Sequence, residues 1–439
     1  MARTSSSPSP AIGGAAAGGR SIAVDLYPFL RVYEGGHIER LVRSTAAVAA
    51  SHDGAVGVGG RPARDGVATR DVVIDEGTGA SARLFLPGGA GAAGGGAGRR
   101  LPLVLYFHGG AFVTGSAFGR LFHRYAASLA VRAGALVVSV EYRLAPEHPL
   151  PAAFVDGWAA LRWATSLADP WLARYADLTR VFLAGESAGA TIAHNVAVRA
   201  AGPDGDDVDI EGMALLQPCF WGAQWLPSEE AASKRAEPPM LAPDRLDALW
   251  PYVTAGAAGN DDPRIDPPAE DVSSLPCRRA LVAVAEKDAL RERGRRYAAQ
   301  LRGGGGSREV TLVESEGEDH CFHLYRPARA SAVELMDSVA EFISPTSCLQ
   351  TEELPLRHRR RALRHAAGDG NTVASPPCAP RRDQLVLSGG PAKLGRPKAK
   401  VGGGPTCKAQ RYRLVGMGRP MPGGTYKYSI SAAGLRVLC

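Results

Sequence analysis

The amino-acid sequence predicts a mainly parallel α/β sheet with helices on both faces. Two observations carry this prediction. Between Leu101 and Ile343, short apolar segments alternate with longer segments of helical periodicity. Most of the apolar segments are continuous runs, as expected of strands that helices cover on both sides. Alternation of strands and helices places successive strands parallel in one sheet.

Composition and charge narrow the classes of protein. The chain has 439 residues, of which 45% are hydrophobic and 22% charged, as in ordinary globular proteins. Its net charge of +7 comes from one end, because residues 345–439 hold 17 Lys/Arg and 4 Asp/Glu while residues 1–344 hold 34 and 40. An acidic body does not predict specific nucleic-acid binding. No apolar stretch approaches the roughly 18 residues of a membrane helix.

The N-terminal part of the chain consists of segments of different composition. Residues 1–20 include 15 Ala, Gly, Ser or Pro, which predicts a disordered N-terminal extension without a secretory signal. Residues 24–43 mix apolar and charged side chains and predict an N-terminal helix with a short hairpin. Residues 71–87 predict two strands around the turn EGTG. The run Gly88–Gly98 and the segment 302–307 are glycine-rich and predict loops.

The body that follows contains six further predicted strands and five predicted helices. With the first hairpin, the sheet is expected to have eight strands. The predicted strands cover residues 101–109, 135–142, 180–187, 212–218, 280–288 and 309–315. The predicted helices cover residues 119–134, 154–168, 187–201, 291–303 and 331–343.

The remaining residues, 345–439, form a basic tail that is not expected to fold as a domain. They include no Phe or Trp, and many Pro, Gly and Arg. Their four cysteines are too far apart for a zinc pair, and the three cysteines of the body have no short spacing. Reduced thiols are therefore expected, which favours the cytoplasm. The serine-rich start and the basic run 357–365 leave a plastid or nuclear destination open.

The strongest chemical motif is Gly185-Glu186-Ser187-Ala188-Gly189, which matches G-x-S-x-G. A predicted strand precedes it and a predicted helix follows it. A strand–Ser–helix turn is so tight that small residues are needed on both sides of the serine, whose hydroxyl is then exposed above the sheet. Ser187 is therefore the candidate nucleophile, and a glycine-rich turn with an incidental serine is the alternative.

A second motif, His108-Gly109-Gly110-Ala111-Phe112, directly follows the strand at 101–107. Small residues let backbone N–H groups approach a tetrahedral intermediate. We expect Gly109 and Gly110 to supply two oxyanion donors and Ala188 a third, each worth about 3 kcal/mol of barrier. His108 is expected to support this loop.

These two motifs, together with SVEYRLAPEHPLP at 139–151, resemble the hormone-sensitive-lipase-like branch of the α/β-hydrolase fold. The segments AEKDALRERG and GEDHCFHL are similar to the plant carboxylesterases of that branch. The resemblance covers roughly residues 22–344 and implies an α/β-hydrolase domain at 21–344. It does not cover the first twenty residues or the tail.

The nucleophile needs a general base and an acid, which follow it in the order Ser, acid, His in this fold. Asp288 ends one predicted strand and His320 follows the next, so both are expected at the site edge of the sheet. The resemblance assigns Asp288 the orientation of the imidazole and His320 the proton transfer. His323 is the alternative general base. His194 lies about 10 Å along the helix from Ser187, too far to accept its proton. Asp266 and Asp319 are the alternative acids.

The resemblance also implies a small cap over Ser187, formed by residues 22–45 and 218–255. The second segment carries aromatic residues that suit a hydrophobic acyl or alcohol group, although each also suits plain packing. They are Phe220, Trp221, Trp225, Trp250 and Tyr252.

We therefore expect a serine carboxylesterase that hydrolyses small hydrophobic esters through an acyl-enzyme, without metal or organic cofactor. The expected partner is a small-molecule ester, with no specific nucleic acid and no membrane; the sequence does not determine the oligomeric state. The family resemblance offers two alternatives. Gibberellin receptors replace the histidine, whereas this chain keeps His320. Isoflavanone dehydratases reuse the same groups for loss of water.

Overall fold

The computed structural model describes residues 21–42, 46–51, 66–88, 100–203, 208–235, 239–304, 308–344, 428–431 and 434–437. The predicted extension 1–20, residues 89–98 of the first predicted loop, residues 305–307 of the second, and most of the tail lie outside the described residues. Residues up to Glu352 form one compact unit, and Glu353–Cys439 form a second. Within the described part of the chain, no helix is long and apolar enough to cross a membrane.

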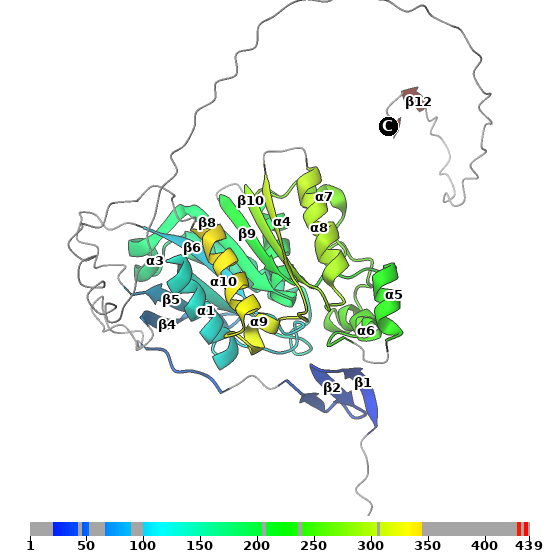
Figure 1. The fold of residues 1–439 in the computed structure, drawn as a ribbon, viewed down its shortest axis with the longest axis horizontal. Helices are drawn as coiled ribbons and strands as arrows, with labels where there is room; N and C mark the ends of the chain where they lie inside the picture. Colours follow the sequence, from blue (N-terminus) through cyan, green and yellow to red (C-terminus); the bar gives the residue numbers. More distant parts are fainter. Residues whose placement is uncertain are drawn as a thin grey trace, which may run out of the picture. The chain divides into compact units, whose positions relative to one another are not determined.

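The first unit is built on an eight-stranded sheet, as the sequence predicts (Figure 1). Its spatial order is β11-β10-β9-β8-β6-β7-β5-β4. The strands are β4 (Val67–Asp75), β5 (Ala80–Pro87), β6 (Leu101–Phe107), β7 (Leu136–Glu141), β8 (Ala176–Glu186), β9 (Ile210–Leu216), β10 (Arg279–Ala285) and β11 (Glu309–Ser315).

Most of this sheet is parallel. The pairs from β11 to β7 all run parallel, whereas β7–β5 and β5–β4 are antiparallel. The central strands are buried on both faces, which explains why their sequences are continuous apolar runs. The prediction of a mainly parallel α/β sheet is therefore confirmed.

Helices cover both faces of the sheet. Helices α1 (Arg120–Ala133) and α10 (Ala330–Ile343) contact each other on one face (Figure 1). The opposite face carries α2 (Ala152–Thr165), α4 (Ala188–Ala200) and α8 (Arg291–Gly303). Side chains alternate along β6 and therefore pack into two different cores. Leu105 and Phe107 pack toward α2 and α4, while Val104 and Tyr106 pack toward α1.

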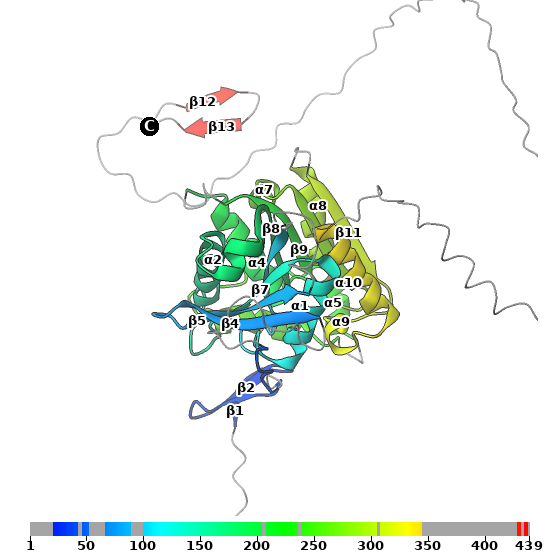
Figure 2. The same ribbon diagram turned by 90° about the vertical axis from the view of Figure 1, so that its left-hand side faces the viewer.

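The N-terminal segment is a separate three-stranded sheet, and the predicted N-terminal helix is wrong. Strands β1 (Ile22–Leu26), β2 (Leu30–Tyr33) and β3 (Ile38–Arg40) pair antiparallel. Pro28 interrupts any helix in the first turn, and Gly35 and Gly36 adopt positive φ in the second turn. Figure 2 shows β1 and β2 in blue, apart from the main sheet.

The insertion after β9 supplies two short helices, α5 (Pro227–Ser233) and α6 (Pro243–Val253). Helix α6 contacts β1, so the two segments expected to form a cap lie together. The other short helices are α3 (Pro170–Tyr175), α7 (Ala269–Ser273) and α9 (Phe322–Tyr325). In the second unit, β12 (Tyr428–Ser431) and β13 (Gly434–Val437) form an antiparallel pair that the sequence did not predict.

A buried ion pair attaches the insertion to the body. Arg293 of α8 donates through Nε to Glu229 Oε1 of α5 at 2.7 Å, and both side chains are buried. Removing one partner of such a pair leaves the other charge buried and alone, which costs several kcal/mol.

We therefore expect Arg293→Met to lower the free energy of unfolding by about 3 kcal/mol, because Glu229 loses its counter-charge. Arg295→Met on the same helix is the matched control. Its guanidinium is 40% exposed and pairs with Glu314 at the surface, so about 1 kcal/mol or less is expected. Urea denaturation of both variants measures the difference, and equal losses would contradict this account.

Candidate active site

Ser187 lies in a tight turn between β8 and α4. Its φ is +53°, an unusual backbone conformation for a residue other than glycine. A Cβ on Gly189 would lie 2.0 Å from the carbonyl oxygen of Phe107, and one on Gly185 would lie 2.5 Å from the backbone of Gly189. Only glycine fits at both positions, as the G-x-S-x-G spacing indicates.

Ser187, His320 and Asp288 form a continuous chain of hydrogen bonds. The Oγ of Ser187 lies 2.9 Å from His320 Nε2, and His320 Nδ1 lies 2.7 Å from Asp288 Oδ2. All three side chains are at least 95% buried. The carboxylate accepts from Nδ1–H, which leaves Nε2 free to accept the serine proton.

The topology explains how residues so distant in sequence meet. Ser187 follows β8, Asp288 follows β10 and His320 follows β11, and these strands run parallel. Their carboxyl ends therefore open at one edge of the sheet. Asp288 also accepts from the backbone N–H of Leu290 at 3.0 Å, which fixes the orientation of the carboxylate.

The environment of His320 favours its protonated form. Burial by itself lowers the pKa of the imidazole, but the adjacent Asp288 carboxylate outweighs this effect and raises the pKa above its ordinary value. Positive charge that develops on the ring is therefore stabilised by Asp288.

The loop after β6 differs from the sequence-based expectation at one residue. The N–H of Gly109 donates to Oε1 of Glu186 at 2.5 Å, so this group is already occupied. The N–H groups of Gly110 and Ala111 have no acceptor within the described residues, nor has the N–H of Ala188 at the start of α4. Gly109 therefore anchors the loop, and the N–H groups of Gly110 and Ala111 remain free to donate.

Glu186 is the buried side chain that holds this loop. Its second oxygen accepts from the hydroxyl of Tyr106 at 2.6 Å. Burial raises the pKa of Glu186 to about 8, although its hydrogen bonds oppose the shift. No pattern in the sequence indicates the partners of Glu186, because Gly109 is 77 residues away.

His108 packs against the same loop. Its Nδ1 lies 2.7 Å from the carbonyl oxygen of Gly109, and its ring stacks on Tyr142 at 4.3 Å. Burial lowers the pKa of His108 to about 4, so the ring is neutral at pH 7. Its contacts support the loop.

The alternative residues have other partners. His194 Nδ1 lies 2.9 Å from the hydroxyl of Tyr297, and Asp266 lies beside Arg293. Asp319 accepts from the backbone N–H of His320 at 2.7 Å. His323 packs edge-on against Tyr125 in the layer of α1. Within the described residues, none of them hydrogen-bonds to Ser187.

A pocket of about 370 Å³ opens above Ser187. Its walls come from the loop after β6, the start of α1, the corner at α9, and the predicted cap segments. The N-terminal sheet and its continuation contribute Pro28, Phe29 and Val42, and the insertion contributes Met240. No motif in the sequence marks these four residues.

Arg40 fastens the N-terminal sheet to the loop after β6. Its Nε donates to the carbonyl oxygen of Val113 at 2.7 Å, and its two terminal nitrogens pair with the Glu147 carboxylate. One side of the pocket is therefore a small sheet that the Arg40 guanidinium links to the loop after β6.

Comparison with curated proteins gives the relatives of this chain. A model of the α/β-hydrolase fold matches residues 104–324. The chain is 38% identical over 340 residues to 2-hydroxyisoflavanone dehydratase of Glycyrrhiza echinata, covering 74% of this chain and 97% of that protein. It is 35% identical over 328 residues to probable carboxylesterase 2 of Arabidopsis thaliana, covering 74% and 97%. It is 39% identical over 330 residues to an amyloplastic tuliposide A-converting enzyme of Tulipa gesneriana, covering 73% and 80%.

Two esterases among the solved structures are also similar to this chain. A hyperthermophilic esterase of the archaeon Pyrobaculum calidifontis is 30% identical with a TM-score of 0.52, covering 63% of this chain and 84% of that one. A thermostable carboxylesterase cloned from a metagenomic library is 30% identical with a TM-score of 0.55, covering 63% and 87%. Both match the parallel sheet described above. The chain therefore belongs to the α/β-hydrolase fold family, as a member of its plant carboxylesterase branch of ester hydrolases.

Proposed function

We propose that this protein is a serine carboxylesterase in which Ser187 is the nucleophile, His320 the general base and Asp288 the orienting acid. The observation that carries the proposal is the buried hydrogen-bonded chain of 2.9 Å and 2.7 Å through these residues. A nucleophile and base within hydrogen-bond distance, with the base oriented by a carboxylate, is the arrangement that acyl transfer requires.

The reaction proceeds in two halves. Ser187 Oγ bonds to the ester carbonyl carbon as its proton passes to His320 Nε2. The bond to the alcohol oxygen then breaks, and the alcohol leaves with that proton. Water attacks the acyl-enzyme, His320 takes a proton from it, and collapse returns the proton to Ser187 and releases the carboxylic acid.

The oxyanion is bound by the N–H groups of Gly110, Ala111 and Ala188. These donors are free in the described structure, whereas the N–H of Gly109 is held by Glu186. Ala111 has φ of +54°, a costly conformation that the surrounding loop maintains. Donors fixed before the substrate arrives need no reorganisation during the reaction.

The substrate is a small uncharged ester with an apolar body. No Asp, Glu, Lys or Arg lines the described part of the pocket, whose walls include Phe29, Phe122, Met240 and Leu324. A charged acyl or alcohol group would lose its hydration there without a partner.

Dehydration is the second candidate, because one relative with 97% of its length matched is named as a 2-hydroxyisoflavanone dehydratase. The same oxyanion donors and His320 suit proton abstraction next to a ketone. Loss of water from a 2-hydroxyisoflavanone, without turnover of simple esters, would favour this candidate over the esterase.

We place the protein in the cytoplasm, where thiols stay reduced. Cys219, Cys277 and Cys321 are free and buried. The relative from tulip is named as amyloplastic, which makes the plastid the alternative. Cell fractionation with an antibody to the full chain distinguishes the two.

Ser187→Ala is expected to lower turnover of short-chain p-nitrophenyl esters by at least about a thousandfold, because no nucleophile remains. Ser338→Ala, at a half-buried site on α10 where the hydroxyl bonds only to the carbonyl oxygen of Glu334 in the described structure, is the control and should keep wild-type turnover. A folded wild type without esterase activity, or an active Ser187→Ala variant, would contradict the proposal.

The pH dependence of kcat/KM tests whether Asp288 is the orienting acid. His320 must be neutral to accept the serine proton, so kcat/KM rises with pH as His320 loses its proton. Asp288→Asn removes the charge that raises the pKa of His320, so the rising limb should move to lower pH while kcat falls by about 10⁴. Asp319→Asn is the matched control, expected to leave the limb in place. A shift with Asp319→Asn alone would assign the acid there.

Glu186 provides a test of the oxyanion loop. Because the pKa of Glu186 in the folded protein is about 8 against an ordinary value of 4.5, its stabilising contribution is complete below pH 4.5 and is lost as pH rises toward 8. Glu186→Gln should keep activity and remove this part of the pH dependence of the melting temperature. Glu186→Leu should lower both stability and kcat, since Gly109 and Tyr106 lose their acceptor. Equal behaviour of the two variants would refute this role.

A further inference from the structure

The two strands that flank β6 in the sheet each end in a glutamate. The strand order is β8-β6-β7, with Glu186 at the end of β8 and Glu141 at the end of β7. Glu186 holds the near end of the loop after β6 through the N–H of Gly109. The proposed reaction makes no use of Glu141, although this side chain contacts the same loop.

Glu141 holds the far part of the loop after β6. Its Oε2 accepts from the N–H of Ala117 at 2.5 Å. Ala117 is fully buried, so its N–H has no access to solvent and depends on this acceptor. Burial raises the pKa of Glu141 to about 7, and hydrogen bonds from the N–H of Ala117 and the hydroxyl of Ser116 oppose the rise. In either protonation state, an oxygen of Glu141 can accept from Ala117.

The segment that Glu141 holds is part of the pocket wall. Ser116 and Gly119 line the pocket above Ser187. Ala117 lies between these two residues in the chain. An acceptor that fixes the N–H of Ala117 therefore also restricts the backbone that carries both wall residues.

The charged groups near Glu141 have other partners. Arg83 forms two hydrogen bonds with the carboxylate of Asp71, at 2.6 Å and 2.7 Å. The guanidinium of Arg83 also lies over the ring of Phe118, 5.1 Å from its centroid. Within the described part of the chain, Glu141 makes no ion pair, so its hydrogen bonds go to the loop itself.

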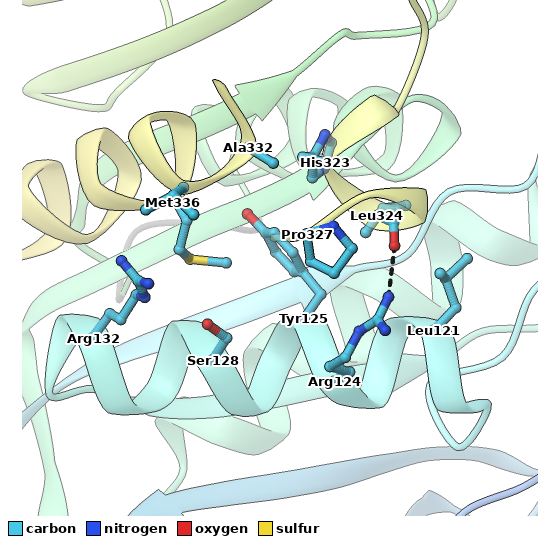
Figure 3. Close-up of a pocket in the computed structure, with 11 residues that line it drawn as sticks. Leu121, Arg124, Tyr125, Ser128, Arg132, His323, Leu324, Pro327, Ala332 and Met336 are labelled. Carbon is cyan, nitrogen blue, oxygen red and sulfur yellow. Dashed lines mark hydrogen bonds between the residues drawn. The ribbon is translucent and has the colours of Figure 1, made fainter. Parts of the chain in front are cut away.

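The chain on both sides of this segment is attached independently. On the side toward β6, Arg40 donates to the carbonyl oxygen of Val113 at 2.7 Å. On the other side the chain enters α1, where Figure 3 shows Arg124 donating to the carbonyl oxygen of Leu324, at 2.8 Å. Loss of the Glu141 contact is therefore expected to alter the pocket wall without displacing α1 or the proposed oxyanion donors.

We propose that Glu141 is a positioning residue that shapes the substrate pocket by holding residues 116–119, while Glu186 holds the other end of the same loop. Glu141 does not line the pocket, and it acts through Ala117. Two carboxylates from neighbouring strands thus divide the loop into a part that binds the oxyanion and a part that binds substrate. This inference rests on the proposed function, which assigns the pocket to an ester.

Substitutions at Glu141 separate substrate binding from chemistry. Glu141→Met keeps the length of the side chain and removes the acceptor. It should raise KM for p-nitrophenyl butyrate at least about fivefold and keep kcat within about twofold, because the wall changes and the triad does not. Glu141→Gln keeps an acceptor oxygen and should restore KM to within about twofold of the wild-type value. Glu76→Met, at an exposed acid outside the pocket, is the control and should leave KM unchanged.

A general loss of stability would give a different pattern. Partial unfolding lowers the concentration of active enzyme, so it lowers the apparent kcat and leaves KM as it was. That pattern in Glu141→Met would overturn the inference, as would a Glu141→Gln variant with the same KM as Glu141→Met.

Hydrogen exchange separates this inference from the esterase proposal, because it needs no substrate. Mass spectrometry of residues 113–119 should show slow exchange of the Ala117 amide in the wild type and in Glu141→Gln. Exchange should be at least about tenfold faster in Glu141→Met, whose Ala117 amide has lost its acceptor. This result in a protein that hydrolyses no ester would support the positioning role and contradict only the esterase proposal.

Unchanged exchange in Glu141→Met would overturn the positioning role even if the wild type is an active esterase. If Glu141→Met fails to fold, the wild type decides. Slow exchange of its Ala117 amide would support the contact with Glu141, and rapid exchange would overturn it.

Discussion

The close approach of the Ser187 turn to the end of β6 is the constraint on which the site depends. With glycine at 185 and 189, the backbone of α4 reaches the carbonyl oxygen of Phe107, where a Cβ at 189 would lie 2.0 Å away. This approach brings Glu186 within 2.5 Å of the N–H of Gly109. Ser187 and the N–H groups of the loop are therefore held close together, and glycine at 185 and 189 permits this approach.

Both polar networks of the site lie in the interior, where the low dielectric strengthens each interaction. One network runs from Asp288 through His320 to Ser187, and the other joins Tyr106, Glu186 and Gly109. In the proposed mechanism, the first network moves protons and the second positions the loop whose N–H groups bind the oxyanion. The two networks are joined by the peptide bond between Glu186 and Ser187, at the end of β8.

Sequence patterns predict the parts of this molecule that depend on local spacing. The central strands are continuous apolar runs, and the turn at Ser187 can form only with glycine at 185 and 189. Both features could therefore be predicted from the sequence. A helix was wrongly predicted in the N-terminal segment, because its strands are stabilised by long-range packing. Leu26 and Leu30 are buried in the main core. The partner of Gly109 could not be foreseen either, because Glu186 reaches it from another strand. The position of His323, away from Ser187, likewise follows from the layer in which α9 lies.

The contacts of Arg40 join two structurally separate parts of the pocket, the edge of the main sheet and the N-terminal sheet. The hydrogen-bonding groups around Ser187 come from the main sheet, whereas Pro28, Phe29 and Val42 come from a small sheet and its continuation. Residues on that sheet can change size without moving the strand ends that carry Ser187, Asp288 and His320. Selection can therefore retune substrate choice through the first strands of the chain, while the guanidinium contacts to Val113 and Glu147 keep the altered wall in register with the chemistry.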